Sequence, residues 1–410
     1  MAVTTHARPA PDPAAYARSF DARVAEVLPD AARASPGLRR RCEAAGLAPD
    51  DLTDAAALER LPVMSKDELL EAQRADPPFG GLLADGARPR RVFQSPGPLY
   101  EPEPAVPDHW RWAPALEAAG FGAGDVVLDA FGYHLSPAGA MFEQAAVALG
   151  CTVVPAGVGN AELQLQACAD LGVTGYIGLP SYLKSLLEKA EDGGPAWAPE
   201  RAFVTAEPLP PSLRAWLDER VGTLRQGYGT AEAGNLGYEV DGVEGLLVPD
   251  DALVQICRLG DGAPIVDGAE GQVVVTVLSP EYPLVRFGTG DVSAWAVDGA
   301  GAALPRPRIR GWLGRVGDAV KVRGMFLHPR QIEEAMAGFD GLGDWRFVVE
   351  RVDHRDELRC EVVPAGADAD ALAESVRARV RDRLRFGVEV VTVPTLEGPG
   401  PLDDRRDWSE

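Results

Sequence analysis

The segment Arg286-Phe-Gly-Thr-Gly-Asp291 decides the fold class of this 410-residue chain. It follows an alternating apolar stretch, Gly271-Gln-Val-Val-Val-Thr-Val277, that is typical of a β-strand. The Gly-Thr-Gly sequence predicts a turn that ends the strand and presents one carboxylate, Asp291. An acidic side chain at such a turn can accept hydrogen bonds from both hydroxyls of a ribose. The segment therefore predicts a nucleotide site, although an ordinary hairpin turn would explain it when taken alone.

A second segment, Gly314-Arg-Val-Gly-Asp-Ala-Val-Lys-Val-Arg-Gly324, follows further along the chain. It predicts one short strand that carries Lys321 and Arg323. The chain then runs into His328-Pro-Arg-Gln-Ile-Glu-Glu334, where a proline in the first turn and acids behind it predict a helix start. His328 itself is most simply a residue of the helix cap. The order of the segments predicts a nucleotide site beside a domain joint.

The composition argues against two classes of partner. A hydrophobic content of 46% with 25% charged residues is ordinary for a globular enzyme, and the length allows a large core domain plus a smaller one. The net charge of −22 argues against nucleic acid, because binding to its backbone needs clustered cations. No apolar run approaches the roughly 20 residues that span a bilayer, so we expect no membrane partner.

The cysteines and the N-terminus favour a cytoplasmic protein. The five cysteines are scattered without C-x-x-C spacing, which is typical of reduced, buried thiols. The predicted β region over 239–285 contains a single cysteine, Cys257, so we expect no zinc site there. The first 20 residues lack the compact apolar core of a signal peptide, so export is not expected.

The middle of the chain alternates between strand and helix patterns. Residues 126–227 give short apolar runs separated by helical segments at 138–149, 164–171, 181–190 and 211–220. Such alternation predicts a doubly wound α/β domain with a parallel sheet. Upstream, residues 1–75 predict helices over 14–28 and 31–45 and a further helix capped by Ser65, with acids in its first turn.

The end of the chain predicts a second, smaller domain. It has helices over 329–337 and 368–385 and strands over 345–351, 357–363 and 388–393, which together predict an α+β domain. The expected fold class is therefore α/β. It consists of a large doubly wound N-terminal domain with a β subdomain, over 1–313, and a small α+β C-terminal lid domain, over 314–410.

Several motifs resemble those of the adenylate-forming superfamily, and most closely its phenylacetate–CoA ligase branch. The resemblance rests on the Thr-Gly-Asp and Gly-Arg…Lys-x-Arg-Gly segments above, and on Gln226-Gly-Tyr-Gly-Thr-Ala-Glu232. It extends over nearly the whole chain through FGYHLSPAG (131–139), GCTVVPAGVGN (150–160), GLPSYL (178–183), TAEPLP (205–210) and HPRQIEEAM (328–336). The N-terminal sequence LPVMSKDEL (61–69) resembles the family weakly, and a generic capped helix explains it equally well.

The resemblance implies a site for ATP or AMP and Mg²⁺. Tyr228 would stack on adenine, Thr230 would lie near the α-phosphate, Asp291 would hold the ribose, and Glu232 would hold the metal. The implied nucleotide-binding residues are Ser95, Gly97, Glu207, Pro208, Tyr228, Gly229, Thr230, Asp291 and Arg315. The implied catalytic residues are Glu232, Arg315 and Lys321, of which Lys321 serves the thioester-forming step. Gly317 stands where the family usually has a hinge aspartate, and glycine there frees the backbone for rotation.

The sequence departs from the family at two places needed for the first step. The phosphate loop is a Ser/Thr/Gly run that ends in lysine in the family, whereas here it reads Gln94-Ser-Pro-Gly-Pro98, and its two prolines remove backbone donors. The C-terminal catalytic lysine is also missing, and Arg405 and Arg406 are the cations of that segment. An arginine supplies charge but not the same point contact as a lysine.

The resemblance implies a ligase that activates an aryl or small acyl carboxylic acid as an acyl-adenylate and transfers it to CoA or another thiol. The implied acid pocket contains Phe131, Tyr133, His134, Ala206 and Gly227, although His134 is more simply a structural histidine. Two alternatives stay open: a half-enzyme that uses preformed acyl-AMP, and a non-catalytic homologue that binds nucleotide or acyl-CoA. The resemblance also allows a homodimer.

Overall fold

The computed structural model describes residues 12–95, 97–296, 306–316, 320–323, 325–327, 329–366, 368–396 and 400–406. The chain divides into two compact units. Unit 1 comprises Met1–Pro208 and Trp216–Val316, and unit 2 comprises Leu209–Ala215 and Gly317–Glu410. The predicted domain limit at 313/314 stays a prediction; Gly314 and Arg315 form a strand of unit 1.

Unit 1 begins with short helices. They are α1 (Pro13–Arg18), α2 (Asp21–Ala34), α3 (Pro36–Ala44), the 3₁₀ turn η1 (Pro49–Asp51), α4 (Ala55–Leu58) and α5 (Lys66–Ala75). The predicted helix limits at 28 and 31 are corrected, because the breaks fall after Arg18 and at Ser35, whereas the limit at 45 coincides with the C-cap of α3. Ser35 Oγ accepts the Leu38 N–H at 3.2 Å, and Pro36 can only begin a helix, so α3 starts at this point.

The largest sheet of unit 1 has eight strands in the order β13-β9-β8-β7-β6-β5-β3-β4. Its parallel part consists of β3 (Val126–Asp129), β4 (Thr152–Pro155), β5 (Gly175–Gly178), β6 (Arg201–Val204) and the start of β7 (Thr223–Thr230). The strands β8 (Gly234–Tyr238), β9 (Leu246–Leu247) and β13 (Arg308–Ile309) continue it in antiparallel fashion. The predicted doubly wound arrangement is confirmed.

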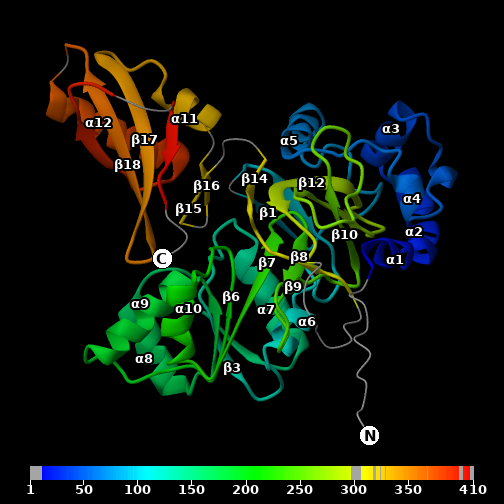
Figure 1. Cartoon of the computed structure of the whole chain (residues 1–410), viewed down its shortest axis with the longest axis horizontal. Coiled ribbons are helices and arrows are strands. Elements are labelled where there is room, and N and C mark those ends of the chain that lie inside the picture. Colours follow the sequence, from blue (N-terminus) through cyan, green and yellow to red (C-terminus); the bar gives the residue numbers. More distant parts are fainter. Residues whose placement is uncertain are drawn as a thin grey trace, which may run out of the picture. The chain divides into compact units, whose positions relative to one another are not determined.

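Helices cover both faces of this sheet. One face carries α6 (Ala113–Ala118) and α7 (Ala138–Ala148), and the other carries α8 (Ala161–Leu171) and α9 (Pro180–Glu191) (Figure 1). The helix α10 (Pro211–Asp218) lies between β6 and β7 in the sequence. In such sheets, ligands bind where the strands end at their carboxyl edge. A ligand-binding site is therefore expected in the segments that follow β3, β6 and β7.

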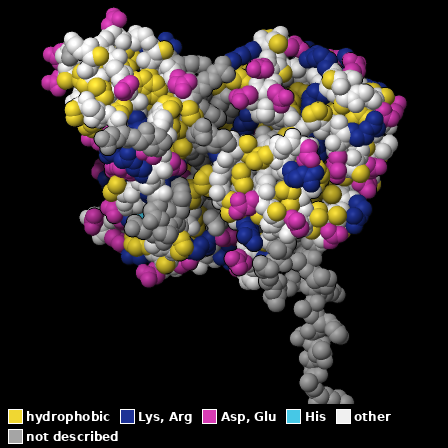
Figure 2. Space-filling view, turned by 45° about the horizontal axis from the view of Figure 1, so that its top comes forward, with side chains coloured by type: hydrophobic (Ala, Val, Ile, Leu, Met, Phe, Trp, Pro, Cys, Tyr) yellow, Lys and Arg dark blue, Asp and Glu magenta, His cyan; other side chains and the backbone are white. Residues whose placement is uncertain are grey.

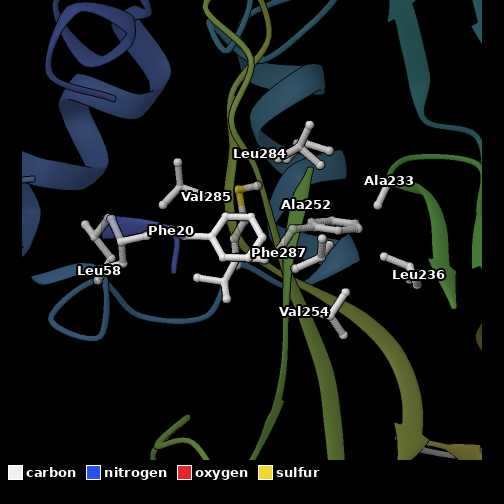
Figure 3. Close-up of a cluster of buried hydrophobic side chains, with 14 of the residues drawn as sticks. Phe20, Leu58, Ala233, Leu236, Ala252, Val254, Leu284, Val285 and Phe287 are labelled. Carbon is white, nitrogen blue, oxygen red and sulfur yellow. The ribbon is translucent and has the colours of Figure 1, made fainter. Parts of the chain in front are cut away.

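A second sheet of unit 1 has the order β10-β11-β12-β14, with β10 at Ala252–Cys257, β11 at Gly271–Val277, β12 at Leu284–Ser293 and β14 at Gly314–Arg315. Its apolar face packs against the N-terminal helices (Figure 3). Phe20 and Leu58 from the helices lie beside Val285 and Phe287 of β12, and all four side chains are buried. The β subdomain and the N-terminal helices therefore share one core.

Unit 2 is an α+β unit, as predicted. A four-stranded sheet in the order β19-β18-β17-β20 carries α11 (Pro329–Met336) and α12 (Ala369–Leu384), and a separate hairpin joins β15 (Val320–Val322) to β16 (Met325–Leu327) (Figure 1). The sheet strands are β17 (Leu342–Val352), β18 (Arg355–Pro364), β19 (Glu389–Thr392) and β20 (Leu402–Asp404). The predicted single strand after Gly314 is wrong, because β14 and β15 are separate and belong to different units.

Charged side chains of both signs are interspersed over the face shown in Figure 2. Some ion pairs join residues that are close in sequence, such as Arg258 and Asp261, whose charged atoms lie 2.7 Å apart. Among the described residues, no helix is long and apolar enough to cross a membrane.

Candidate active site

Asp291 lies on a bulge of β12, not in the terminal turn that the sequence predicts. Gln272 and Val274 of β11 pair with Val292 and Gly288, so a single residue of β11 faces three residues of β12, from Thr289 to Asp291. The bulge interrupts the ladder and redirects the side chains that it carries. The prediction of a turn is corrected, since the Gly-Thr-Gly sequence stays within one strand.

The carboxylate of Asp291 has three side-chain partners in unit 1. It accepts hydrogen bonds from the hydroxyl of Tyr228 at 2.9 Å and from the indole of Trp312 at 3.2 Å, and it pairs with the guanidinium of Arg315 at 3.1 Å. Burial raises the pKa of Tyr228 well above its usual value, and the charge of Asp291 raises it further. The structure thus joins three of the predicted site residues, Tyr228, Asp291 and Arg315.

Glu232 occupies the tight turn between β7 and β8. The turn closes on Gly234, whose φ is +69°, and a Cβ atom there would lie 2.4 Å from the carbonyl oxygen of Trp110, so only glycine fits. Thr230 Oγ1 accepts the Ala233 N–H at 3.2 Å and holds the turn together. The charge of the Glu232 carboxylate also acts to raise the pKa of Arg315, against the effect of burial, so Glu232 is electrostatically linked to the partner of Asp291.

Lys66, the first residue of α5, pairs with Glu232. Its Nζ lies 2.7 Å from Glu232 Oε1, and the exposed fractions of the two side chains are 24% and 3%. Burial opposes ionisation of Glu232, but the charge of Lys66 and its hydrogen bond outweigh burial and lower the pKa of the carboxyl group. Glu232 is therefore an ionised carboxylate that is held by a lysine.

Glu101 of β2 (Tyr100–Glu103) is a second buried acid beside this pair. Burial raises its pKa well above the usual range, and the charge of Glu232 raises it further, while Lys66 acts in the opposite direction. Among the described atoms, Glu101 Oε1 and Glu232 Oε2 are buried without hydrogen-bond partners. The pKa values of the two acids are therefore shifted in opposite directions, and each acid has one buried oxygen that a ligand could contact.

Hydrogen bonds to neighbouring strands anchor the helix α5 near its start and near its end. At its start, Met64 pairs with Phe287 of β12, through Met64 N–H to the Arg286 carbonyl at 2.8 Å and Gly288 N–H to the Met64 carbonyl at 2.9 Å. Near its end, Gln73 forms two hydrogen bonds with the backbone of Tyr100, at 2.8 and 2.9 Å. The Asp291 strand and the hairpin that contains the phosphate loop thus fix the position of Lys66.

The segment predicted to be an altered phosphate loop forms the tip of a hairpin between β1 (Arg91–Gln94) and β2. Ser95 is buried, its N–H donates to the Leu99 carbonyl at 2.9 Å, and its Oγ has no hydrogen-bond partner among the described atoms. Gly97 is half-buried, and Pro96 lies outside the described residues. The Ser95 hydroxyl is therefore an available donor in a loop that has lost others.

Several of the predicted acid-pocket residues lie in or against a cluster of aromatic side chains in unit 1. Phe131 stacks on Phe142, with ring centroids 5.0 Å apart, and the Tyr133 hydroxyl donates to the buried carboxylate of Asp129 at 2.9 Å. Gly227 lies against Phe203 and Trp112, so that a Cβ atom would approach their rings to 2.6 and 2.9 Å. All four of these phenylalanine and tryptophan rings are buried and belong to one hydrophobic core cluster of unit 1.

The remaining predicted residues are spread more widely. Ala206 has a φ of +70° and packs on the aromatic cluster, and Glu207 accepts a hydrogen bond from Ser181 at 2.6 Å. Pro208 and Gly229 are half-buried, and His134 is exposed. Lys321 lies on β15 of unit 2, and nothing is described of its side chain. Gly317 and His328 lie outside the described residues.

Sequence reasoning missed Lys66 and Glu101 as site residues. The signal for Lys66 was present in the segment LPVMSKDEL, which resembles the family but is explained equally well as a capped helix start. Ser65 is indeed the cap, because its Oγ accepts the Glu68 N–H at 3.1 Å. No local pattern marks Glu101, since its burial results from contacts with distant segments.

The fold is that of the adenylate-forming enzymes. A crystal structure of 2-hydroxyisobutyryl-CoA ligase, in complex with 2-HIB-AMP and CoA in the thioesterification state, matches the chain with a TM-score of 0.85. The two chains are 24% identical, and the match covers 96% of this chain and 91% of that chain. No family model matches the chain.

Relatives of known activity are similar over most of the chain. The phenylacetate–coenzyme A ligase of Escherichia coli K12 is 29% identical over 372 residues, which are 86% of this chain and 83% of the relative. That of Pseudomonas putida is 31% identical over 315 residues, with 73% and 70% covered. The chain belongs to the phenylacetate–coenzyme A ligase family. The predictions of the family, of the fold class and of an acid–thiol ligase are confirmed.

Proposed function

We propose that the protein activates a carboxylic acid with ATP to form an acyl-adenylate and then transfers the acyl group to the thiol of CoA. The observation that carries the proposal is the convergence of Tyr228, Asp291, Arg315 and Glu232 on one edge of unit 1, in a chain of this family. In the first step a carboxylate oxygen attacks the α-phosphorus of ATP and pyrophosphate leaves. In the second step the thiolate attacks the acyl carbon and AMP leaves.

The described residues fit AMP and a magnesium ion in these roles. Asp291 would accept the ribose hydroxyls and Arg315 would contact a ribose or phosphate oxygen, while the buried Oε2 atom of Glu232 offers one free carboxylate position. Mg²⁺ is usually held by one or two carboxylates together with substrate phosphates, so a single glutamate is sufficient. When bound, the ion would neutralise charge on the phosphates. Lys321 of unit 2 would serve the thioester-forming step.

The acid itself is proposed to be aryl or small acyl. The stacked rings of Phe131 and Phe142 and the approach of Phe203 and Trp112 to Gly227 favour a flat, apolar acyl group over a charged one. The phenylacetate named for the relatives fits this character. A cytoplasmic, homodimeric protein with no zinc site is part of the same proposal.

A second candidate is a half-enzyme that runs only the thioester step from a preformed acyl-AMP. It is favoured by the engagement of both terminal arginines, because Arg406 pairs with Asp356 at 3.1 Å and Arg405 pairs with Asp403 at 2.7 Å. The third candidate, a non-catalytic protein that binds nucleotide or acyl-CoA, would bind AMP and turn over neither step.

The test is exchange of labelled pyrophosphate into ATP, with Mg²⁺, across a panel of aryl and aliphatic acids. Exchange that depends on an acid and is lost in Glu232→Ala supports the full reaction. Absence of exchange, combined with thioester formation from synthetic acyl-AMP and CoA, supports the half-enzyme instead. AMP binding by calorimetry without either reaction supports the binding protein.

A further inference from the structure

The first half-reaction needs a cation close to the phosphates, and the chain has few lysines to supply one. It contains four: Lys66, Lys184, Lys189 and Lys321. Lys184 and Lys189 lie on α9, where they pair with Glu188 at 2.9 Å and with Glu162 at 2.8 Å. Lys321 lies in unit 2. Lys66 is thus the one lysine that the described structure places on the Glu232 carboxylate.

The terminal arginines form ion pairs within unit 2. The Arg406 side chain is only 2% exposed and pairs with Asp356 and Asp404 of its own sheet. Arg405 pairs with Asp403 and lies 3.8 Å from Glu350. Both arginines therefore neutralise acids within unit 2, which favours another residue as the source of charge for adenylation.

The positive charge of Lys66 destabilises the start of the helix α5 to which it belongs. A cation at the first residue of α5 faces the positive end of the helix dipole, where acids such as Asp67 and Glu68 are favoured. Its stabilisation comes from Glu232, which is distant in the sequence but lies 2.7 Å away. The hydrogen bonds of Met64 with β12 and of Gln73 with Tyr100 keep the start of the helix in place.

We infer that Lys66 binds the phosphates of ATP and supplies the positive charge that the missing lysines supply elsewhere in the superfamily. The Nζ atom already lies on the carboxylate that is expected to hold the phosphates through a metal, and its side chain is 24% exposed while that of Glu232 is 3% exposed. The ammonium group of Lys66 is therefore more accessible to solvent than the carboxylate of Glu232. This inference rests on the proposed function.

Lys66 would act without proton transfer. As the carboxylate of the acid forms its bond to the α-phosphorus, the bond to the bridging oxygen breaks and negative charge grows on the departing pyrophosphate. A protonated lysine that contacts these oxygens stabilises the charge and keeps its own proton throughout.

The test compares Lys66→Met, Lys66→Arg and the control Lys189→Met in three assays. Pyrophosphate exchange should fall roughly 10²-fold or more in Lys66→Met, because the loss of one donor at developing charge has this effect. Lys66→Arg should retain part of the exchange, and Lys189→Met all of it. Thioester formation from synthetic acyl-AMP and CoA should change by no more than a few fold in any variant.

Calorimetric binding gives a readout that does not require turnover. Mg·ATP affinity should fall about tenfold in Lys66→Met, whereas AMP affinity should stay the same, because the lysine contacts phosphates that AMP lacks. Equal loss for both nucleotides, or exchange at the wild-type rate in Lys66→Met, would overturn the inference and leave the proposed function intact. A wild-type protein without exchange would overturn the proposed first step, while selective loss of ATP binding would still support Lys66 as the phosphate ligand. Lys66→Arg keeps the charge beside Glu232, so it separates this role from a folding defect.

Discussion

The hydroxyl of Tyr228 donates a hydrogen bond to the carboxylate of Asp291 at 2.9 Å, although the two residues belong to different sheets of unit 1. Tyr228 pairs with Gly237 of β8, just beyond the parallel pairing of β7 with β6 that ends at Gln226, and Asp291 lies on the bulge of β12. The hydrogen bond joins two of the segments on which the resemblance to the family rests, Gln226–Glu232 and Arg286–Asp291. It also fixes the carboxylate where ribose hydroxyls are expected to bind.

Asp291→Ala should weaken AMP binding roughly 10²-fold, because two hydrogen bonds to a charged group contribute about 3 kcal/mol or more. Tyr228→Phe is the matched variant, since it keeps the ring for adenine and removes only the hydroxyl. We expect its AMP affinity to change by no more than about fivefold. Calorimetry with AMP measures both, and an equal loss in the two variants would show that the hydroxyl, and not the carboxylate, carries the binding.

Several of the residues that the motifs predicted for the site lie close together in the structure, and each lies at a recognisable local feature of the sequence. Tyr228, Glu232, Asp291 and Arg315 all lie in short Gly-containing segments, and the structure brings them together. Lys66 was not predicted as a site residue because its local sequence is that of any helix start, and its partner Glu232 is distant in the chain.

Pairing over distance explains the other differences. Thr289–Asp291 forms a bulge and not a turn because β12 pairs with β11 on both sides of these residues, and local sequence cannot reveal that pairing. The short strand β20 is fixed by its pairing with β17 and was likewise not predicted. The strands and helices of the doubly wound region were predictable, because their apolar patterns repeat over many residues.

Glu101→Gln should raise the stability of the protein at neutral pH. In the folded state burial raises the pKa of Glu101 above its unfolded value of roughly 4.3, so the native protein binds this proton more tightly than the unfolded chain. The stability linked to that proton is present below the unfolded pKa and is lost as the pH rises through the folded pKa. A neutral glutamine avoids the loss.

Thermal unfolding from pH 4.5 to pH 8 checks this pH dependence. The melting temperature of Glu101→Gln should exceed that of the wild type at pH 7.5, and the difference should shrink towards pH 4.5. The exposed Glu71→Gln on α5 is the control and should show no such trend. A wild type that is more stable than Glu101→Gln at pH 7.5 would mean that Glu101 is ionised beside Lys66.

Gly227→Ala should destabilise the protein and narrow the acid pocket. The added Cβ would lie 2.6 Å from Phe203 and 2.9 Å from Trp112, and both rings are buried in the core. Overpacking of this kind typically costs about 1–3 kcal/mol. Exchange with an aryl acid should fall more than exchange with a short aliphatic acid.

The control for this substitution is Gly260→Ala, where a Cβ atom would meet nothing within 4 Å. Urea unfolding gives the stability change, and pyrophosphate exchange with the two acids gives the pocket effect. If both acids lost activity in the same ratio, Gly227 would be a packing residue and not a determinant of the acid.

Arg406→Met should lower the stability of the protein much more than Arg405→Met, while neither variant should change catalysis by more than a few fold. Arg406 is nearly buried between Asp356 and Asp404, and its removal leaves acids without their cation, at a cost on the order of 3 kcal/mol. Arg351 also pairs with Asp356, at 3.3 Å, so the loss should stay at the lower end for a broken buried pair. Arg405 is 40% exposed, and its ion pairs should contribute less than about 1 kcal/mol.

Pyrophosphate exchange at a temperature where both variants remain folded then tests the catalytic role of these arginines. We expect exchange within a few fold of the wild type in both variants, because the two cations serve the acids of their own sheet. A large loss in Arg405→Met with unchanged stability would mean that this arginine leaves Asp403 to contact the phosphates. In that event the C-terminal segment keeps its catalytic function with arginine in place of lysine, and Lys66 would share the charge instead of supplying it alone.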